Sequence, residues 1–297
     1  MPQKVPVSVL LIVKNEEMNI RHCLESTKWA DQVIVVDSQS TDKTVEIAKK
    51  YTRDIYQFVW DGKFYKKQWA FDHVKFSHDW ILMIDADERV TEGFRNEIES
   101  IVADSSNAAA GYIVRYDYWF LGRFIKFGDP VRKIILFRKS KSSFEPFKVA
   151  GRESIKNIKL ETGHELPIIK GKIDFARKRM LHADQRPLYD YFDRHNRYST
   201  WEAEHLFMKF HLQDAIESNT VDSPVKLRRF FKNIFMRLPF KPFVYFFYGY
   251  IFRLGFLDGY PGLCYNVCKS IYAYQIALKF YELKLRAKGD VPCQQSL

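Results

Sequence analysis

The chain has 297 residues, enough for one substantial hydrophobic core and a smaller extension, and too few for a large multidomain assembly. Its 47 Lys and Arg residues exceed its 36 Asp and Glu residues by 11, which favours anionic partners such as nucleic acid, anionic lipid or a phosphorylated substrate. Its four cysteines form no CxxC pattern, so the sequence predicts neither a zinc site nor a disulfide framework.

The first part of the chain alternates buried strands with helices. Short runs rich in Val, Ile and Leu predict strands at residues 7–15, 32–37, 54–60 and 80–87. Helical spacing predicts helices at 16–27, after the polar turn 38–44, at about 63–74, and from Glu92 with Thr91 as its N-cap. This alternation indicates an α/β fold with a mixed, mostly parallel sheet and helices on both faces.

The pattern changes after Gly111. Residues 111–120 and 131–139 predict longer strands, and the Gly- and Pro-containing connection between them is typical of antiparallel or mixed pairing. A helix is expected at about 189–211, followed by a polar linker at 214–224. We therefore expect an α/β domain over residues 1–212 and a helical region over residues 213–297.

An Asp-Ala-Asp triplet, Asp85 to Asp87, directly follows a predicted buried strand. Ligands of such sheets bind beyond the carboxyl ends of the strands, where Asn15 and Asp37 also fall. A hard cation such as Mg²⁺ or Mn²⁺, held by one or two carboxylates and by phosphate oxygens, would neutralise a diphosphate there. Acidic pairs at strand ends are also common as solvated or helix-capping groups, and that alternative stays open.

The polar turn after Asp37 supports this interpretation. An Asp at the end of this strand can accept a hydrogen bond from a base or a ribose. Ser40, Thr41 and Asp42, in contrast, are expected to have a structural role as caps of the next helix.

In this order, the motifs resemble those of the family 2 glycosyltransferases with the GT-A fold, in particular the lipopolysaccharide inner-core β-1,4-glucosyltransferases. The matching stretches are VSVLLIVKNEEMNIRHCLES, VIVVDSQSTDKTVEIAKKY, WILMIDADERVT, GRFIKFG, VRKIILFRK and GFLDGYPGL. The resemblance covers most of the chain. It implies an inverting transfer of a hexose from a nucleotide sugar, with a divalent metal on the donor's diphosphate.

The resemblance also implies which residues contact the donor. Val13, Asn15, Glu16 and Asp37 would border the uridine pocket. Lys67 would contact the donor, although Gln68 replaces the Asn that often follows it in the family.

For the metal, the resemblance implies that Asp87 is the direct ligand and that Asp85 faces the ribose or the donor sugar. His182 would be a second metal ligand or a diphosphate contact. A lone His is more often structural, so that alternative remains for His182.

The resemblance further implies that Glu153 is the general base that takes the acceptor's proton. Arg152 stands where the family usually has His, and a surface ion pair between Glu153 and Arg152 is the alternative. Asp174 and Asp184 are fallback bases.

Arg194 and Arg197 resemble residues of a segment that closes over the donor in relatives. An Arg in such a segment could bind the diphosphate bidentately. The alternative, given equal weight, is that both residues only pack on the surface of a helix.

The region between Ser223 and Leu257 combines basic and aromatic residues and contains no acidic residue. Cations above a belt of aromatic side chains are typical of a segment that lies in a membrane interface. The apolar stretches are too short or too polar to span a bilayer, so the sequence predicts monotopic or peripheral attachment. The alternative is that these helices pack on the catalytic domain or form a homo-oligomer interface.

We therefore expect a UDP-sugar donor, with glucose as the sugar, and a lipid-linked saccharide acceptor such as lipopolysaccharide inner core. The protein would work at the cytoplasmic face of the inner membrane, on an anionic surface, without a nucleic-acid partner. Another cell-surface polysaccharide or a polyprenyl-linked acceptor is the alternative. Two other classes are a non-catalytic nucleotide-sugar binder and a nucleotidyltransferase. Nucleotidyltransferases typically have a Gly- and Arg-rich phosphate-binding loop near the N-terminus, and VSVLLIVKNEE lacks such a loop.

Overall fold

The computed structural model of the protein describes residues 4–59, 66–128, 131–144, 167–216 and 241–288. These residues form two compact units. The first contains the described residues up to Lys126, then 131–144 and 167–186, and the second contains Phe127, Gly128 and the described residues from Pro187 onward. The boundary expected at 212/213 lies inside the helix Leu188–Ile216, which belongs as a whole to the second unit. In the structure, the chain enters this last part of the second unit at Pro187.

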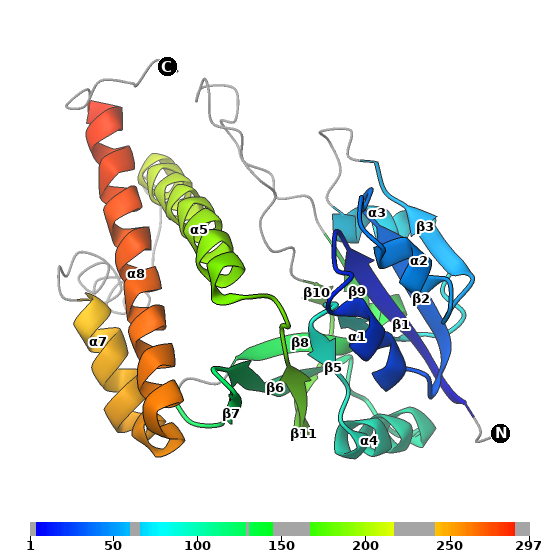
Figure 1. The fold of residues 1–297 in the computed structure, drawn as a ribbon. Helices are drawn as coiled ribbons and strands as arrows, with labels where there is room; N and C mark the ends of the chain where they lie inside the picture. Colours follow the sequence, from blue (N-terminus) through cyan, green and yellow to red (C-terminus); the bar gives the residue numbers. More distant parts are fainter. Residues whose placement is uncertain (1–3, 60–65, 129–130, 145–166, 217–240, 289–297) are drawn as a thin grey trace. The chain divides into compact units, whose positions relative to one another are not determined.

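The first unit is built on a nine-stranded sheet in the order β3-β2-β1-β4-β8-β6-β11-β5, with β7 added beside β6 (Figure 1). The strands are β1 (Val5–Val13), β2 (Ala30–Asp37), β3 (Asp54–Gln57), β4 (Trp80–Ile84), β5 (Glu88–Arg89), β6 (Gly111–Phe120), β7 (Arg123–Ile125), β8 (Arg132–Arg138) and β11 (Ile173–His182). Two short strands, β9 (Ser142–Ser143) and β10 (Ile168–Ile169), pair separately. Strands β1 to β4 run parallel, whereas β8 lies antiparallel to both β4 and β6. The mixed sheet expected from the sequence is confirmed.

Helices cover both faces of this sheet, as the burial of consecutive side chains of β1 requires. Val7, Val9 and Leu11 pack with α1 (Ile20–Ser26), α2 (Thr44–Ala48) and α4 (Glu92–Ala103). Leu10 points to the other face and packs with α3 (Lys66–His73). Because successive side chains of a strand point to opposite faces, one apolar strand can supply both layers of the core.

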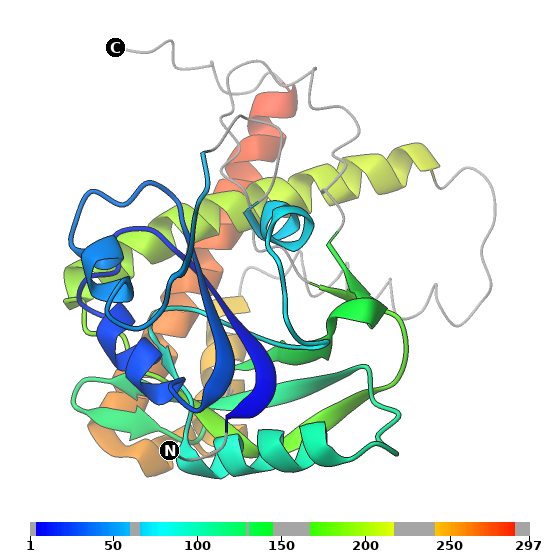
Figure 2. The same ribbon diagram turned by 90° about the vertical axis from the view of Figure 1, so that its right-hand side faces the viewer.

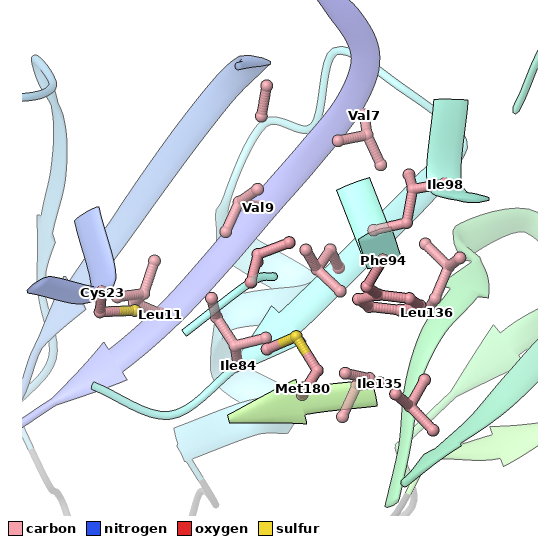
Figure 3. Packing of buried hydrophobic residues seen from close by; sticks show 14 of the residues in the cluster. Val7, Val9, Leu11, Cys23, Ile84, Phe94, Ile98, Ile135, Leu136 and Met180 are labelled. Carbon is pink, nitrogen blue, oxygen red and sulfur yellow. The ribbon is translucent and has the colours of Figure 1, made fainter. Parts of the chain in front are cut away.

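Figure 3 shows the larger of these two layers. Phe94 and Ile98 of α4 lie among Val7 of β1 and Leu136 of β8, and all four are fully buried. Burying such a side chain contributes roughly 1.5–3 kcal/mol. The layer thus holds the parallel half of the sheet to its antiparallel half.

The second unit is helical. Its helices are α5 (Leu188–Ile216), α7 (Lys241–Phe247) with the π-helical turn η3 (Tyr248–Phe252), the 3₁₀ turn η4 (Gly255–Asp258) and α8 (Gly259–Lys288). Helix α8 packs against both α5 and α7 (Figures 1 and 2). In the part of the chain that the structure describes, no helix combines the length and apolar character that a bilayer crossing needs.

The turn between α7 and α8 depends on close contacts of small residues. The Asn266 side chain of α8 lies so near Gly249 that a Cβ there would be 2.2 Å from Asn266 Oδ1. Asp258, buried at the end of η4, accepts a hydrogen bond from the N–H of Phe127 at 2.9 Å. Within GFLDGYPGL, a Cβ on Gly255 would lie 2.6 Å from Asn266 Nδ2 and a Cβ on Gly262 would lie 2.4 Å from the Gly255 carbonyl oxygen, which explains why both positions are glycine.

Thr91 caps α4 and ties it to β11. Its hydroxyl oxygen accepts from the N–H of Phe94 at 3.1 Å, and its O–H donates to the carbonyl of Arg179 at 2.8 Å. We expect Thr91→Ala to lower the free energy of unfolding by about 1–2 kcal/mol. Thr91→Ser, which keeps the hydroxyl, should retain most of the stability. Urea unfolding followed by far-UV circular dichroism measures both variants, and equal midpoints for Thr91→Ala and wild type would contradict the cap assignment.

Candidate functional site

The loops that follow β1 and β2 are fastened to each other by hydrogen bonds. The N–H of Asn15 donates to Ser40 Oγ at 2.9 Å, and the Asn15 side chain accepts from the N–H of Thr41 at 2.8 Å. The N–H of Glu16 donates to Thr44 Oγ1 at 2.7 Å. Asn15 has φ of 54°, a left-handed conformation that Asn adopts more readily than most residues. Ser40 and Thr41 therefore have a structural role in joining the two loops.

Asp37 and Val13 lie at the ends of their strands, opposite each other in the parallel register of β1 and β2. Both side chains are buried, and Asp37 is only 1% exposed. Its carboxylate accepts hydrogen bonds from the N–H and the hydroxyl of Ser40. Asp37 thus organises the loop after β2, and its contact with a nucleotide stays a prediction.

The Asp-Ala-Asp turn joins β4 to the short strand β5. Strand β5 pairs antiparallel with β11, in a register that places His182 opposite Glu88. The N–H of Ala183 also donates to the carbonyl of Asp87 at 2.8 Å. This pairing explains how residues almost a hundred positions apart in the chain meet at one turn.

Lys133 of β8 contacts the other end of the turn. Strand β8 runs antiparallel to β4 with Leu136 opposite Leu82, and the same offset places Lys133 opposite Asp85. Lys133 Nζ lies 2.7 Å from Asp85 Oδ2 and 2.6 Å from Glu88 Oε1. The ammonium group therefore bridges two carboxylates of the same turn.

Glu88 is completely buried, and its carboxylate accepts three hydrogen bonds. Besides Lys133, the hydroxyl of Tyr116 donates to it at 3.0 Å and the N–H of Asp85 donates at 3.2 Å. Burial raises the pKa of Glu88, although Lys133 opposes that shift. For Asp85, whose side chain is 55% exposed, the charge of Lys133 is the main influence and holds the pKa of Asp85 well below its ordinary value. The turn thus carries one buried and one partly solvated carboxylate on the same cation.

Asp87 and His182 lie side by side. His182 Nε2 is 3.5 Å from Asp87 Oδ2, and the imidazole stacks on Tyr118 with a centroid distance of 4.3 Å. The other carboxylate oxygen, Asp87 Oδ1, is buried and meets no hydrogen-bond donor in the described residues. A buried carboxylate oxygen without a donor is unusual and needs an explanation.

These two side chains fit a divalent cation. Two atoms that each bind one cation at about 2.1 Å are roughly 3.0–3.5 Å apart in octahedral or tetrahedral geometry. The separation of His182 Nε2 and Asp87 Oδ2 agrees with that range, and Asp87 Oδ1 has a lone pair to spare. No group of three His, Cys, Asp or Glu side chains in the described ranges could hold a metal alone. Mg²⁺ commonly binds through one or two carboxylates and substrate phosphates, so a pair of ligands suffices.

Arg186 joins three carboxylates and contacts Asp87 at Oδ2, the same oxygen that lies near His182. Its guanidinium contacts Asp184 at 2.8 Å, Glu16 at 3.0 Å and Asp87 at 3.4 Å. Burial raises the pKa of Glu16, and its neighbours Asn19 and Arg186 oppose that shift. Asp184, a fallback base in the sequence analysis, is therefore committed to an ion pair.

The remaining predicted residues belong to other elements of the chain. Lys67 is on α3, and its charge contributes to the lowered pKa of Asp85. Arg194 and Arg197 are on α5 of the second unit, where Arg197 pairs with Asp193 at 3.1 Å. Glu153 lies outside the described residues.

Sequence reasoning missed three charged residues of this site: Glu88, Lys133 and Arg186. Glu88 directly follows the Asp-Ala-Asp triplet, so its place in the sequence was a usable signal. Lys133 could not be found without the antiparallel pairing of β8 with β4. Arg186 lies four residues after His182, but its three partners come from separate loops.

Comparison with known proteins agrees with the architecture of the first unit. The family described as Glycosyl transferase family 2 matches residues 8–152. An uncharacterized glycosyltransferase of Rickettsia bellii is 28% identical over 94% of this chain and 86% of its own length. The lipopolysaccharide core biosynthesis glycosyltransferase LpsC of Rhizobium meliloti is 27% identical over 97% of both chains.

A solved structure of S. aureus TarS, residues 1–349, aligns with 94% of this chain and 92% of its own, at 14% identity and a TM-score of 0.38. The assignment therefore rests on the sequence matches, which cover the strands, the joined loops and the acidic turn. Residues 8–152 thus match glycosyl transferase family 2, and over most of its length the chain is similar to proteins named as glycosyltransferases, which supports transferase activity.

Proposed function

We propose that this enzyme transfers a hexose, glucose in the first instance, from a UDP-sugar to a lipid-linked glycan, with inversion at the anomeric carbon and with Mg²⁺ or Mn²⁺ on the donor. The observation that carries the proposal is the paired Asp87 and His182, with a buried carboxylate oxygen that meets no donor among the residues that the structure describes. The bound cation would offset the negative charge that develops on the leaving diphosphate.

The residues of this chain would divide the remaining tasks. Asn15 and Glu16, on the loop after β1, would border the uridine, while Asp87 and His182 would hold the cation. Asp85, whose carboxylate is partly exposed, would accept hydrogen bonds from hydroxyls of the ribose or the sugar. As an acceptor oxygen bonds to the anomeric carbon and the bond to the diphosphate breaks, Glu153 would take the acceptor's proton.

The acceptor class is supported by LpsC, whose name places it in lipopolysaccharide core biosynthesis. Another cell-surface polysaccharide or a polyprenyl-linked sugar would need the same donor chemistry. We therefore propose the class of lipid-linked glycans and test the donor first.

The donor side is testable by metal-dependent UDP release. We expect wild-type protein to bind UDP in the presence of Mn²⁺ and to release UDP from a UDP-sugar with a suitable acceptor. Asp87→Asn should reduce that rate at least about a hundredfold, because the diphosphate would lose its counter-charge. Calorimetry with UDP and Mn²⁺, together with a UDP-release assay over several sugar donors, measures both effects. Wild-type protein that neither binds UDP nor releases it from any donor would refute the proposal.

The base is tested separately. Glu153→Gln should retain UDP and Mn²⁺ binding while losing about a hundredfold or more in transfer, because general-base catalysis is worth that much. Asp31→Asn is the matched control, since this carboxylate lies at the start of β2, pairs with His78 at 2.7 Å and should leave transfer unchanged. Equal transfer by Glu153→Gln and wild type would exclude Glu153 as the base. Wild-type binding without turnover would instead favour a non-catalytic binder.

We also propose that the second unit attaches the enzyme to the anionic, cytoplasmic face of the inner membrane. Between residues 243 and 260, large apolar side chains are exposed on α7, η3, η4 and the start of α8. They are Phe243, Val244, Tyr245, Phe247, Tyr248, Ile251, Phe252, Leu254, Phe256, Leu257 and Tyr260. We call this set the aromatic surface. Asp258, the one acidic residue between 241 and 281, is buried, whereas that stretch contains Lys241, Arg253, Lys269 and Lys279. Exposed aromatics with cations and no exposed acid suit an anionic lipid headgroup region.

Vesicle binding tests the aromatic surface. Phe243, Phe252 and Tyr260 are 61%, 76% and 73% exposed, so serine there should leave the fold intact. We expect the triple serine variant to bind phosphatidylglycerol vesicles at least about tenfold more weakly, since each ring buries apolar area in lipid. Serine at Phe175 and Tyr281, each 60% exposed elsewhere, is the matched control. Unchanged vesicle binding combined with a loss of dimers in light scattering would identify the surface as an oligomer interface instead.

A further inference from the structure

Lys133 is not assigned by the proposed function, yet it makes the shortest contacts in the acidic turn. Its ammonium lies 2.7 Å from Asp85 and 2.6 Å from Glu88, and it extends over the ring of Tyr116 at 5.5 Å. Its side chain is 33% exposed, so these partners hold much of it out of solvent.

Glu88 anchors Lys133 from a buried, hydrogen-bonded position in the turn. The Glu88 carboxylate is fully buried and already accepts from Tyr116 and from the N–H of Asp85. A buried carboxylate that loses a partner becomes strongly destabilising, so Glu88 keeps the ammonium in place. Lys133 therefore reaches Asp85 from a fixed position in the sheet.

Asp85 and Asp87 consequently have different neighbours: Asp85 contacts Lys133, whereas Asp87 contacts Arg186 at 3.4 Å and lies beside His182. Asp85 Oδ2 is occupied by Lys133, whereas Asp87 Oδ1 meets no donor among the described residues and Asp87 Oδ2 faces His182. The two carboxylates of this turn thus have different surroundings, because a different strand lies beside each of them. Strand β8 supplies Lys133 to one, and β11 supplies His182 to the other.

We infer that Lys133, anchored by Glu88, is a positioning residue that keeps Asp85 out of the metal's coordination and reserves it for the hydroxyl groups of the donor. The inference rests on the proposed metal-dependent function. It makes the acidic turn bind the cation through Asp87 alone, with His182 as partner. It also explains why a lysine lies beside a turn that must attract a divalent cation.

Mn²⁺ binding in the presence of UDP tests this division of roles, and free Mn²⁺ is measured by electron paramagnetic resonance. We expect Asp87→Asn to lose about a hundredfold or more in affinity for Mn²⁺, as the removal of a direct ligand should. Lys133→Met should bind Mn²⁺ more tightly, on the order of tenfold, because it removes a nearby positive charge and frees Asp85 as a second ligand. Lys133→Arg, which keeps the charge, should restore the wild-type value.

The double variant Asp85→Asn with Lys133→Met separates this inference from a simple charge effect. It removes one charge of each sign, so it should bind Mn²⁺ with close to the wild-type affinity if Asp85 is not a ligand. Affinity as weak as that of Asp87→Asn would show that Asp85 binds the metal and would overturn the inference. Lys172→Met, which removes an exposed lysine paired with Asp174, is the matched control and should leave Mn²⁺ affinity unchanged.

Asp85→Asn alone covers the case in which loss of Lys133 prevents folding, because it leaves the pair of Lys133 and Glu88 in place. It should lower Mn²⁺ affinity by less than about tenfold, through the unbalanced charge of Lys133, while raising KM for the sugar donor. A loss of Mn²⁺ binding equal to that of Asp87→Asn would overturn the inference. Wild-type protein that binds no Mn²⁺ would overturn both the inference and the metal-dependent function, whereas a failed variant comparison would leave the latter intact.

Discussion

The buried carboxylate of Glu88 is the constraint on which the acidic turn depends. An ionised carboxylate that leaves water loses several kcal/mol of solvation unless hydrogen bonds and an opposite charge replace it. Here the replacements come from Tyr116 of β6, Lys133 of β8 and the N–H of Asp85 after β4. Because these strands are neighbours in the sheet, the need to satisfy one carboxylate fixes the place where β4 ends and the turn begins.

From that fixed turn, the neighbouring strands determine what each aspartate can do. Two carboxylates two residues apart have the same intrinsic chemistry, and their surroundings alone can separate their roles. The antiparallel neighbour β8 brings a cation to Asp85, whereas the pairing of β5 with β11 brings an imidazole to Asp87. The change from parallel to antiparallel pairing at β8 is thus what makes the two positions inequivalent.

Local patterns in the sequence were sufficient for the parallel half of the fold. The short apolar run of β1 and the cap at Thr91 depend on neighbours within a few positions, and both were predicted. The roles of Lys133 and Arg186 depend on contacts with residues 45 to 170 positions away, so no local pattern could identify them. His182 was found only through family resemblance, since its neighbours are Asp87, in the turn before β5, and Tyr118 of β6, and no local pattern specifies the pairing of β11 with β5 and β6.

The charges of the whole site explain why an exchangeable cation suits this chemistry. Glu16, Asp85, Asp87, Glu88 and Asp184 contribute five carboxylates, and within the described part of the chain Lys133 and Arg186 form ion pairs with them. An anionic diphosphate would be repelled by such a cluster unless more positive charge accompanied it. A further fixed lysine would remain after the reaction and hold the diphosphate product. A divalent cation that shares its ligands with the diphosphate can arrive and depart with it, and such a cation needs only one or two protein ligands. In the proposed site, Asp87 and His182 would supply that number, and the nucleotide and water would supply the remaining ligands.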